Sequence, residues 1–157
     1  MNIAEYILTP VKTDDDVEYL RCIRNECAEF MTRNKNQITK EQQAEWFKNV
    51  DNEYTQLYLV RQHWHGSIID PVPIGYGILR MECGSILLTG GLVKAYRGMG
   101  IGYRLFSMLL EKAKKIGLPI ELQVLDTNES AKNLYSKLGF RIIHECDGII
   151  DMEYINE

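Results

Sequence analysis

A glycine-rich turn between two predicted secondary-structure elements constrains this chain more than any other feature. The turn Arg97-Gly98-Met99-Gly100-Ile101-Gly102 follows an apolar run over 85–93 and opens a helical pattern over 101–116. A helix that begins in this way directs several backbone N–H groups, and the positive end of its dipole, at one point. Glycines allow positive φ angles and close approach of a ligand, and Arg97 adds a permanent charge. The turn therefore predicts a phosphate site, and with it a cofactor that carries a pyrophosphate.

Length and composition predict one globular domain over residues 1–157. No apolar run approaches the roughly 20 residues that a membrane-spanning helix needs, and residues 1–5 do not resemble a secretory signal. The formal net charge of −4 argues against nucleic acid as a partner and is compatible with an amine substrate. We therefore expect no membrane and no nucleic acid among the partners.

The four cysteines form no C-x-x-C pair, and no histidine lies near them at zinc-finger spacing. We expect reduced thiols in a cytoplasmic protein and no metal site. His63 and His65 have the spacing of two ligands on one strand, but ordinary loop histidines are the favoured interpretation.

Hydrophobic periodicity and turn residues predict the order β-α-α-β-β-β-α-β-α-β-β. The expected strands cover 6–10, 54–62, 74–81, 85–93, 120–125, 140–145 and 149–154. The expected helices cover 14–27, with an extension towards 31 left open, and 40–50, 101–116 and 128–138. A loop is expected over 63–73, and hairpin turns at Cys83-Gly84 and Asp147-Gly148. This order predicts an α/β (α+β) fold, in which helices cover both faces of a mixed sheet.

Two known types of phosphate-binding loop can be compared with the glycine-rich turn. A dinucleotide site of the Rossmann type fits the strand, turn and helix, and Asp126 follows the next strand. Its third glycine, however, would fall at Tyr103. A P-loop fails because no Gly-Lys-Ser/Thr closes the turn. A dinucleotide-binding oxidoreductase therefore remains as an alternative.

Two motifs in this chain resemble those of the GNAT superfamily of acyl-CoA-dependent N-acyltransferases. The turn over 97–102 resembles its Arg/Gln-x-x-Gly-x-Gly/Ala signature, and residues 128–140 resemble its Asn-x-x-Ala-x-x-x-Tyr-x-x-x-Gly-Phe segment. The resemblance implies a mostly antiparallel sheet of about seven strands flanked by four helices. It also implies acetyl-CoA as cosubstrate, and transfer of its acetyl group to a primary amine that attacks the thioester directly.

The resemblance also assigns residues to the cofactor. Its pantetheine arm would lie in a V-shaped opening between strands 85–93 and 120–125, bonded to backbone near Leu92 and Val93. The phosphates would lie at the turn, and Asn128 would both cap its helix and contact the cofactor. The cofactor-binding residues of the turn would be Arg97, Gly98, Met99, Gly100, Ile101 and Gly102. Two roles remain open for Gly90-Gly91. They form either a β-bulge that separates the two strands or a close-packed crossing in the sheet.

Tyr135 occupies the position of the general acid in the resembled family. A phenol with a pKa of about 10 can protonate the thiolate of a thiol with a pKa of about 8.5. The same ring would also suit a core position. The general base stays unassigned, because strand 85–93 has no carboxylate. Thr89 with a water, Glu82 through that water, and the acids of the early helices all remain candidates, those acids being Glu26, Glu29, Glu41 and Glu45. The missing carboxylate also leaves open a non-catalytic acyl-CoA-binding module.

The amine acceptor is not identified by the sequence. Residues 24–25, 39–43 and 46–47 faintly resemble GNAT enzymes that acetylate the amino group of a sugar nucleotide, and they fit two amphipathic helices equally well. A protein N-terminus or lysine, a polyamine, an aminoglycoside and an amino acid all remain possible acceptors, so we expect a small-molecule or peptide amine. A homodimer is plausible, and strand 149–154 would either pair with a second subunit or close the sheet.

Overall fold

Seven strands form one mixed sheet in the computed structural model, which describes residues 4–68 and 71–155. The strands follow the order β1-β2-β3-β4-β5-β7-β6, and β4 and β5 are the one parallel pair within the described residues. Their bounds are β1 (Ala4–Pro10), β2 (Thr55–Trp64), β3 (Val72–Glu82), β4 (Ser85–Leu92), β5 (Ile120–Leu125), β6 (Phe140–Cys146) and β7 (Ile149–Tyr154). The predicted class and order of elements are confirmed.

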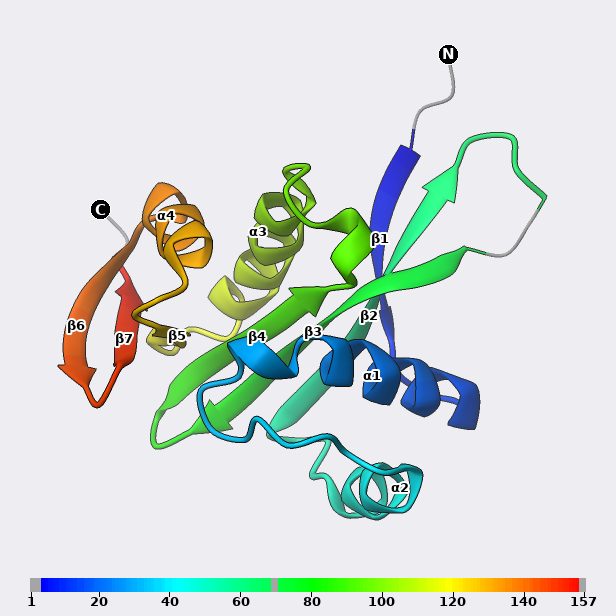
Figure 1. Cartoon of the computed structure of the whole chain (residues 1–157), viewed down its shortest axis with the longest axis horizontal. Coiled ribbons are helices and arrows are strands. Elements are labelled where there is room, and N and C mark those ends of the chain that lie inside the picture. Colours follow the sequence, from blue (N-terminus) through cyan, green and yellow to red (C-terminus); the bar gives the residue numbers. More distant parts are fainter. Residues whose placement is uncertain (1–3, 69–70, 156–157) are drawn as a thin grey trace.

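Four α-helices cover the two faces of this sheet (Figure 1). They are α1 (Asp14–Glu26), α2 (Lys40–Asn49), α3 (Ile101–Lys114) and α4 (Glu129–Leu138), with short 3-10 helices η1 (Ala28–Phe30) and η2 (Lys94–Tyr96). On one face, α1 packs a core with β2 and β3 that includes Leu20, Ile23, Leu59 and Tyr76. On the other face, the larger core is built by α3, α4 and the centre of the sheet, and includes Leu105, Leu109, Ile86, Leu122 and Met152.

Local capping signals set where the helices begin and end. Thr13 accepts a hydrogen bond from the Asp16 amide at 3.1 Å, while the Asp16 carboxylate accepts one from the Thr13 amide at 3.2 Å. Thr39 and Gln42 form the same reciprocal capping box before α2. Because each cap satisfies backbone donors that would otherwise be unpaired, the predicted helix starts are confirmed.

Both predicted hairpin turns are also confirmed. The central residues Cys83 and Gly84 have φ angles of 53° and 79°, and Asp147 and Gly148 have 51° and 80°. Two successive positive φ angles are typical of a type I′ turn, whose twist matches that of the flanking strands.

The predicted loop over 63–73 is wrong at both of its ends. Strand β2 continues through Trp64, because Ala4 and Glu5 of β1 pair with Trp64 and His63. Strand β3 likewise begins at Val72, which pairs with Gln62. In addition, α1 ends at Glu26 and the chain passes into η1 instead of continuing the same helix.

The last strand of the chain lies inside the sheet and has no free edge for a second subunit. Strand β7 is hydrogen-bonded to β5 on one side and to β6 on the other, so both of its edges are paired. Of the two alternatives for residues 149–154, pairing with another chain is therefore wrong, and β6 forms this end of the sheet.

Strands β4 and β5 separate after a short paired region. They pair only from Ile86 to Leu88, opposite 120–122, and β5 then continues beside β7 while β4 continues beside β3. The predicted V-shaped opening is therefore present in the sheet.

The opening arises without a β-bulge at Gly90-Gly91, so that interpretation is wrong. The register of β3 with β4 is regular there, with Gly77 opposite Gly90 and Tyr76 opposite Gly91. Close packing explains the glycines instead. A Cβ at Gly91 would lie 2.7 Å from Cys27 Sγ, and one at Gly90 would lie 3.0 Å from the Tyr76 carbonyl oxygen.

Candidate active site

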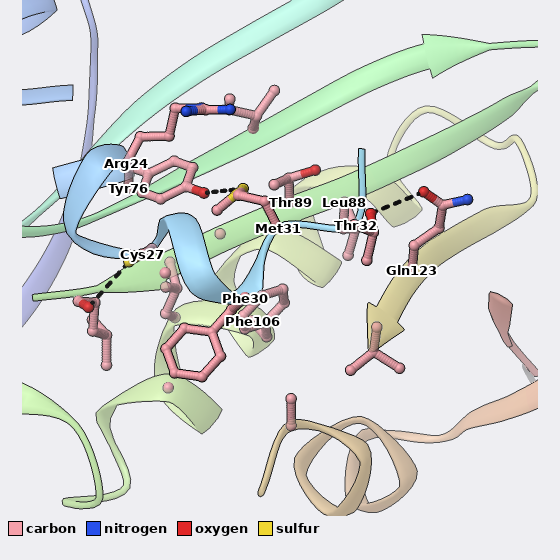
Figure 2. A pocket seen from close by; sticks show the side chains of 18 of the residues that line it. Arg24, Cys27, Phe30, Met31, Thr32, Tyr76, Leu88, Thr89, Phe106 and Gln123 are labelled. Atoms are coloured by element: carbon pink, nitrogen blue, oxygen red, sulfur yellow. Dashed lines mark hydrogen bonds between the residues drawn. The ribbon is translucent and has the colours of Figure 1, made fainter. Parts of the chain in front are cut away.

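One continuous cavity of about 1130 Å³ passes through the opening between β4 and β5. It extends from the glycine-rich turn and α4 to the segment after α1 and the buried side of α2. Figure 2 shows its centre, where Met31 and Thr32 cross over the sheet and reach Tyr76 and Gln123. This single cavity therefore joins the glycine-rich turn to the segment after α1.

The glycine-rich turn lies at one end of this cavity and has the backbone that its sequence predicts. Gly98 and Gly100 have φ angles of 76° and 78°, a conformation that side chains disfavour. Gly100 is also the N-cap residue of α3 and supplies no capping side chain. The first N–H groups of α3 therefore have no side-chain partner from the cap, as an anion site requires.

The other residues of the turn contribute backbone more than side chains. Ile101 is buried in the core, and Met99 is exposed to solvent. Gly102 packs against α4, because a Cβ there would lie 3.1 Å from Leu134 Cδ1. Asn128 lines the cavity and caps α4, accepting a hydrogen bond from the Ala131 amide at 3.2 Å.

The Arg97 side chain points away from the turn and towards α1. Its Nε donates to the Leu92 carbonyl at 3.0 Å, one Nη donates to the Glu26 carbonyl at 3.3 Å, and its guanidinium lies 5.0 Å from the centre of the Phe30 ring. This side chain therefore joins the end of β4 to the end of α1. Arg97 nevertheless lines the cavity, so its predicted contact with the cofactor stays a prediction.

Arg97→Met is therefore expected to destabilise the fold, lowering the free energy of unfolding by about 1–3 kcal/mol. The substitution keeps an apolar stem beside Phe30 but removes the donors to both the Glu26 and the Leu92 carbonyls. Urea unfolding measures the loss. Arg104→Met, at an exposed arginine over Tyr6, is the control. Equal stability of the two variants would show that Arg97 does not hold β4 to α1.

Leu92 and Val93 differ in what their backbone offers the cavity. The Val93 amide donates to the Ile74 carbonyl at 2.9 Å, so it is already paired within the sheet. By the alternation of an antiparallel ladder, the Leu92 N–H points to the opposite side, where β5 has turned away. The prediction that the Val93 amide is a donor towards the cofactor is therefore wrong, and the Leu92 N–H stays a predicted donor.

Tyr135 is both a core residue and a lining residue of the cavity. It is 9% exposed, and its ring packs edge-on against Phe106 at 4.9 Å between ring centres and against Phe140 at 6.2 Å. No hydrogen bond to its hydroxyl is formed within residues 4–68 and 71–155, where no fully buried side-chain polar atom lacks a partner. The hydroxyl is therefore accessible from the cavity, and burial raises the pKa of Tyr135, so the phenol keeps its proton at neutral pH.

The candidate bases lie outside the cavity, with one exception. Glu82 is paired with Arg33 at 3.1 Å beside the hairpin, and Glu26 accepts the Lys94 amide at 2.8 Å. Glu29, Glu41 and Glu45 are exposed on the early helices. Of the residues considered for taking up the proton of the amine, only Thr89 lines the cavity.

The segment over 31–38, which closes the other end of the cavity, was not predicted from the sequence. Asn25 exchanges two hydrogen bonds with the backbone of Ile38, both at 2.8 Å, and Arg24 donates to the carbonyls of Asn34 and Asn36 at 2.9 and 3.2 Å. Residues 31–38 are thus held against α1 by its own side chains. No local motif marks this arrangement, since it depends on contacts between α1 and a segment ten or more residues away.

Comparison with known proteins identifies the fold and the family. The profile of the acetyltransferase (GNAT) family matches residues 23–140, so this chain belongs to the GNAT family. Among curated proteins, none matches this chain closely enough in sequence to count as a relative.

Several solved structures share the whole fold at low sequence identity. A domain from Methanocaldococcus jannaschii aligns with a TM-score of 0.83 at 18% identity, covering 96% of this chain and 98% of that one. Spermidine N-acetyltransferase from Vibrio cholerae, in complex with CoA and spermine, aligns with a TM-score of 0.77 at 16% identity over 94% of each chain. Ribosomal-protein-alanine N-acetyltransferase from Brucella melitensis aligns with a TM-score of 0.73 at 19% identity, covering 96% of this chain and 99% of that one. The predicted resemblance and fold are confirmed.

Of the two histidines expected in a loop, His63 belongs to β2 and only His65 lies beyond that strand. His65 Nε2 lies 2.8 Å from a carboxylate oxygen of Glu5, and no group of three or more metal-binding side chains comes together among the described residues. No helix in those residues is long and apolar enough to cross a membrane.

Proposed function

We propose that this protein transfers an acetyl group from acetyl-CoA to a primary amine on a small molecule or peptide. The observation that carries the proposal is the shared cavity, which brings the glycine-rich turn, the Leu92 amide and the Tyr135 hydroxyl into one space. Membership of the GNAT family and the neighbour in complex with CoA support acetyl-CoA as the cosubstrate.

In the proposed reaction, the backbone amides over 98–102 hold the pyrophosphate of acetyl-CoA, and Asn128 lies beside it. The pantetheine arm extends along the unpaired side of β4, where the Leu92 N–H polarises the thioester carbonyl. The neutral amine attacks the carbonyl carbon, the C–S bond breaks, and the Tyr135 hydroxyl protonates the departing thiolate. Because no carboxylate among the described residues lines the cavity, the proton of the amine leaves through water, which Thr89 can position.

Thermal unfolding with acetyl-CoA, NAD and NADP tests the cosubstrate. A ligand at a hundred times its Kd adds about 2.7 kcal/mol of stability, which raises the Tm of a chain of this size by roughly 5–10 °C. We expect this rise with acetyl-CoA and none with either dinucleotide. Stabilisation by NAD or NADP alone would favour the oxidoreductase instead.

Release of free CoA thiol with a panel of amines separates the enzyme from a non-catalytic acyl-CoA-binding module. The enzyme releases thiol in proportion to an acetylated amine, whereas the module binds acetyl-CoA without release. The four unpaired cysteines, of which Cys22, Cys83 and Cys146 are exposed, support our proposal that the protein works in the cytoplasm. A homodimer remains a prediction, and the sedimentation of the purified protein would test it.

A further inference from the structure

The end of the cavity beside α1 and α2 is lined by positively charged side chains and by no carboxylate among the described residues. None of the described residues that line the cavity is an aspartate or a glutamate. Its basic lining residues are Arg24, Arg33, Arg80, Arg97 and Lys137. Arg33 is paired with Glu82 at 3.1 Å, and Arg97 lies 3.9 Å from a carboxylate oxygen of Glu29. Lys137 is on α4, at the end proposed for the cofactor. Arg24 and Arg80 are therefore the cations that remain at the acceptor end.

Arg24 is half-buried and has only neutral partners in the described structure. Its two Nη atoms donate to the backbone carbonyls of Asn34 and Asn36. Figure 2 shows its side chain extended beside Tyr76 at the edge of the cavity. Burial lowers the pKa of the Arg24 guanidinium, as expected for a cation that is withdrawn from water without a carboxylate beside it. Such an uncompensated charge favours an anion in the adjacent space.

Arg80 approaches the same space from the sheet. It follows Tyr76 and Ile78 at alternate positions of β3, so all three side chains lie on the face that α1 covers. Its side chain is half-buried and makes no hydrogen bond or ion pair within the described residues, although it lines the cavity. A guanidinium placed in this way retains all five N–H donors for a ligand.

Gln43 of α2 adds a polar side chain to the lining of the same cavity. The residue is only 4% exposed, yet its side-chain amide forms no hydrogen bond within residues 4–68 and 71–155. Because no fully buried polar side-chain atom in the described chain is unsatisfied, this amide is open to the cavity. A buried amide that faces a cavity without a protein partner indicates a polar ligand.

We infer that the acceptor is an anionic amine, whose carboxylate or phosphate group is bound by Arg80, while Arg24 adds positive charge to the same cavity and Gln43 hydrogen-bonds the polar body of the acceptor. This inference rests on the proposed acetyl transfer and adds the class of acceptor. A polyamine such as the spermine bound to the Vibrio cholerae enzyme is a polycation. The described lining of this cavity offers it no carboxylate and two uncompensated positive charges, so a polyamine is disfavoured.

Matched pairs of amines test the inference with the intact protein. We would compare glucosamine 6-phosphate with glucosamine, phosphoethanolamine with ethanolamine, and leucine with leucinamide, and include spermidine. Initial rates of thiol release are compared at equal concentrations of the unprotonated amine, because the amine pKa differs within a pair. We expect the anionic member of at least one pair to have a kcat/KM roughly 10- to 100-fold above its uncharged partner. Whether the phosphate or the carboxylate pair responds identifies the anion.

Arg80→Gln is the variant that assigns this preference to a residue. For the anionic amine, we expect kcat/KM to fall roughly 10- to 100-fold, while the uncharged partner and the KM for acetyl-CoA change less than about threefold. Arg80→Lys keeps the charge and should restore part of the loss. Arg104→Gln removes an arginine that does not line the cavity and should change neither rate.

The outcomes separate this inference from the proposed function. If acetyl-CoA neither raises the Tm nor is consumed with any amine, the acetyl-transfer proposal fails. If acetyl-CoA is consumed as fast with the uncharged amines or faster with spermidine, only the anionic acceptor is overturned. If acetyl-CoA binds and no amine reacts, the amines are titrated into the CoA complex in a calorimeter to measure whether they bind. Binding of an anionic member that Arg80→Gln abolishes supports the inference, and failure of all anionic members to bind contradicts it.

Discussion

Tyr135→Phe is expected to lower kcat by roughly 10- to 10⁴-fold while the Kd for acetyl-CoA changes far less. The substitution removes only a hydroxyl that has no hydrogen-bond partner in the described chain and faces the cavity. The ring contacts with Phe106 and Phe140 remain, so the core and the Tm should be retained. Without the hydroxyl, the thiolate must leave unprotonated or take its proton from water. Thiol release under saturating acetyl-CoA measures the loss.

Tyr154→Phe is the matched control for this prediction. Tyr154 belongs to the same group of aromatic rings, with its centre 5.7 Å from that of Phe140, but it does not line the cavity. Removing its hydroxyl tests whether the loss of a tyrosine hydroxyl from this cluster lowers kcat even when that hydroxyl does not face the cavity. If Tyr135→Phe and Tyr154→Phe retain equal and undiminished kcat values, Tyr135 has no role as the general acid.

The elements of the fold were predictable because their ends depend on neighbouring residues. The capping boxes at Thr13 and Thr39 and the left-handed glycine after α4, Gly139, each fix a boundary through groups three or four residues apart. Strands β5 and β7 have the predicted bounds for a similar reason, since turn residues flank both. Such signals can be found in a single sequence without knowledge of tertiary contacts.

The errors occur where a distant partner decides the outcome. The extension of β2 through Trp64 depends on β1, about sixty residues earlier in the chain, with Ala4 opposite Trp64. The direction of the Arg97 side chain is set by its hydrogen bonds to the carbonyls of Leu92 and Glu26. The local motif predicts that Arg97 lies in the turn, but it does not predict where the guanidinium group points.

The two ends of the site also differ in whether local sequence or distant contacts assemble them. The glycine-rich turn and Tyr135 belong to contiguous motifs, and the structure places both on one cavity. Arg80 lies on an ordinary strand and Gln43 on an ordinary amphipathic helix, and only the folded chain brings them to the same space. The acceptor end could therefore not be predicted from local patterns.

Gly100→Ala is expected to raise the Kd for acetyl-CoA by roughly 100-fold, which corresponds to the loss of about two charge-assisted hydrogen bonds. Gly100 has a φ of 78° and is the N-cap of α3. An alanine disfavours this conformation by about 1–2 kcal/mol, and relaxing towards negative φ would rotate the neighbouring N–H groups away from the phosphate position. A Cβ at this position meets no protein atom within 4 Å, so a steric clash inside the fold cannot account for the effect. Calorimetric titration of acetyl-CoA into the variant measures the Kd.

Gly117→Ala, just beyond the other end of α3, is a closely matched control. Gly117 has a φ of 86°, and a Cβ there also meets nothing within 4 Å, so the two substitutions impose similar backbone strain. Both variants should lose about 1–2 kcal/mol of unfolding free energy, because the strain is the same. Only Gly100→Ala should weaken acetyl-CoA binding, since Gly100 lines the cavity and Gly117 does not. If both variants lose affinity equally, the effect comes from general destabilisation of α3, and the turn is not the pyrophosphate site.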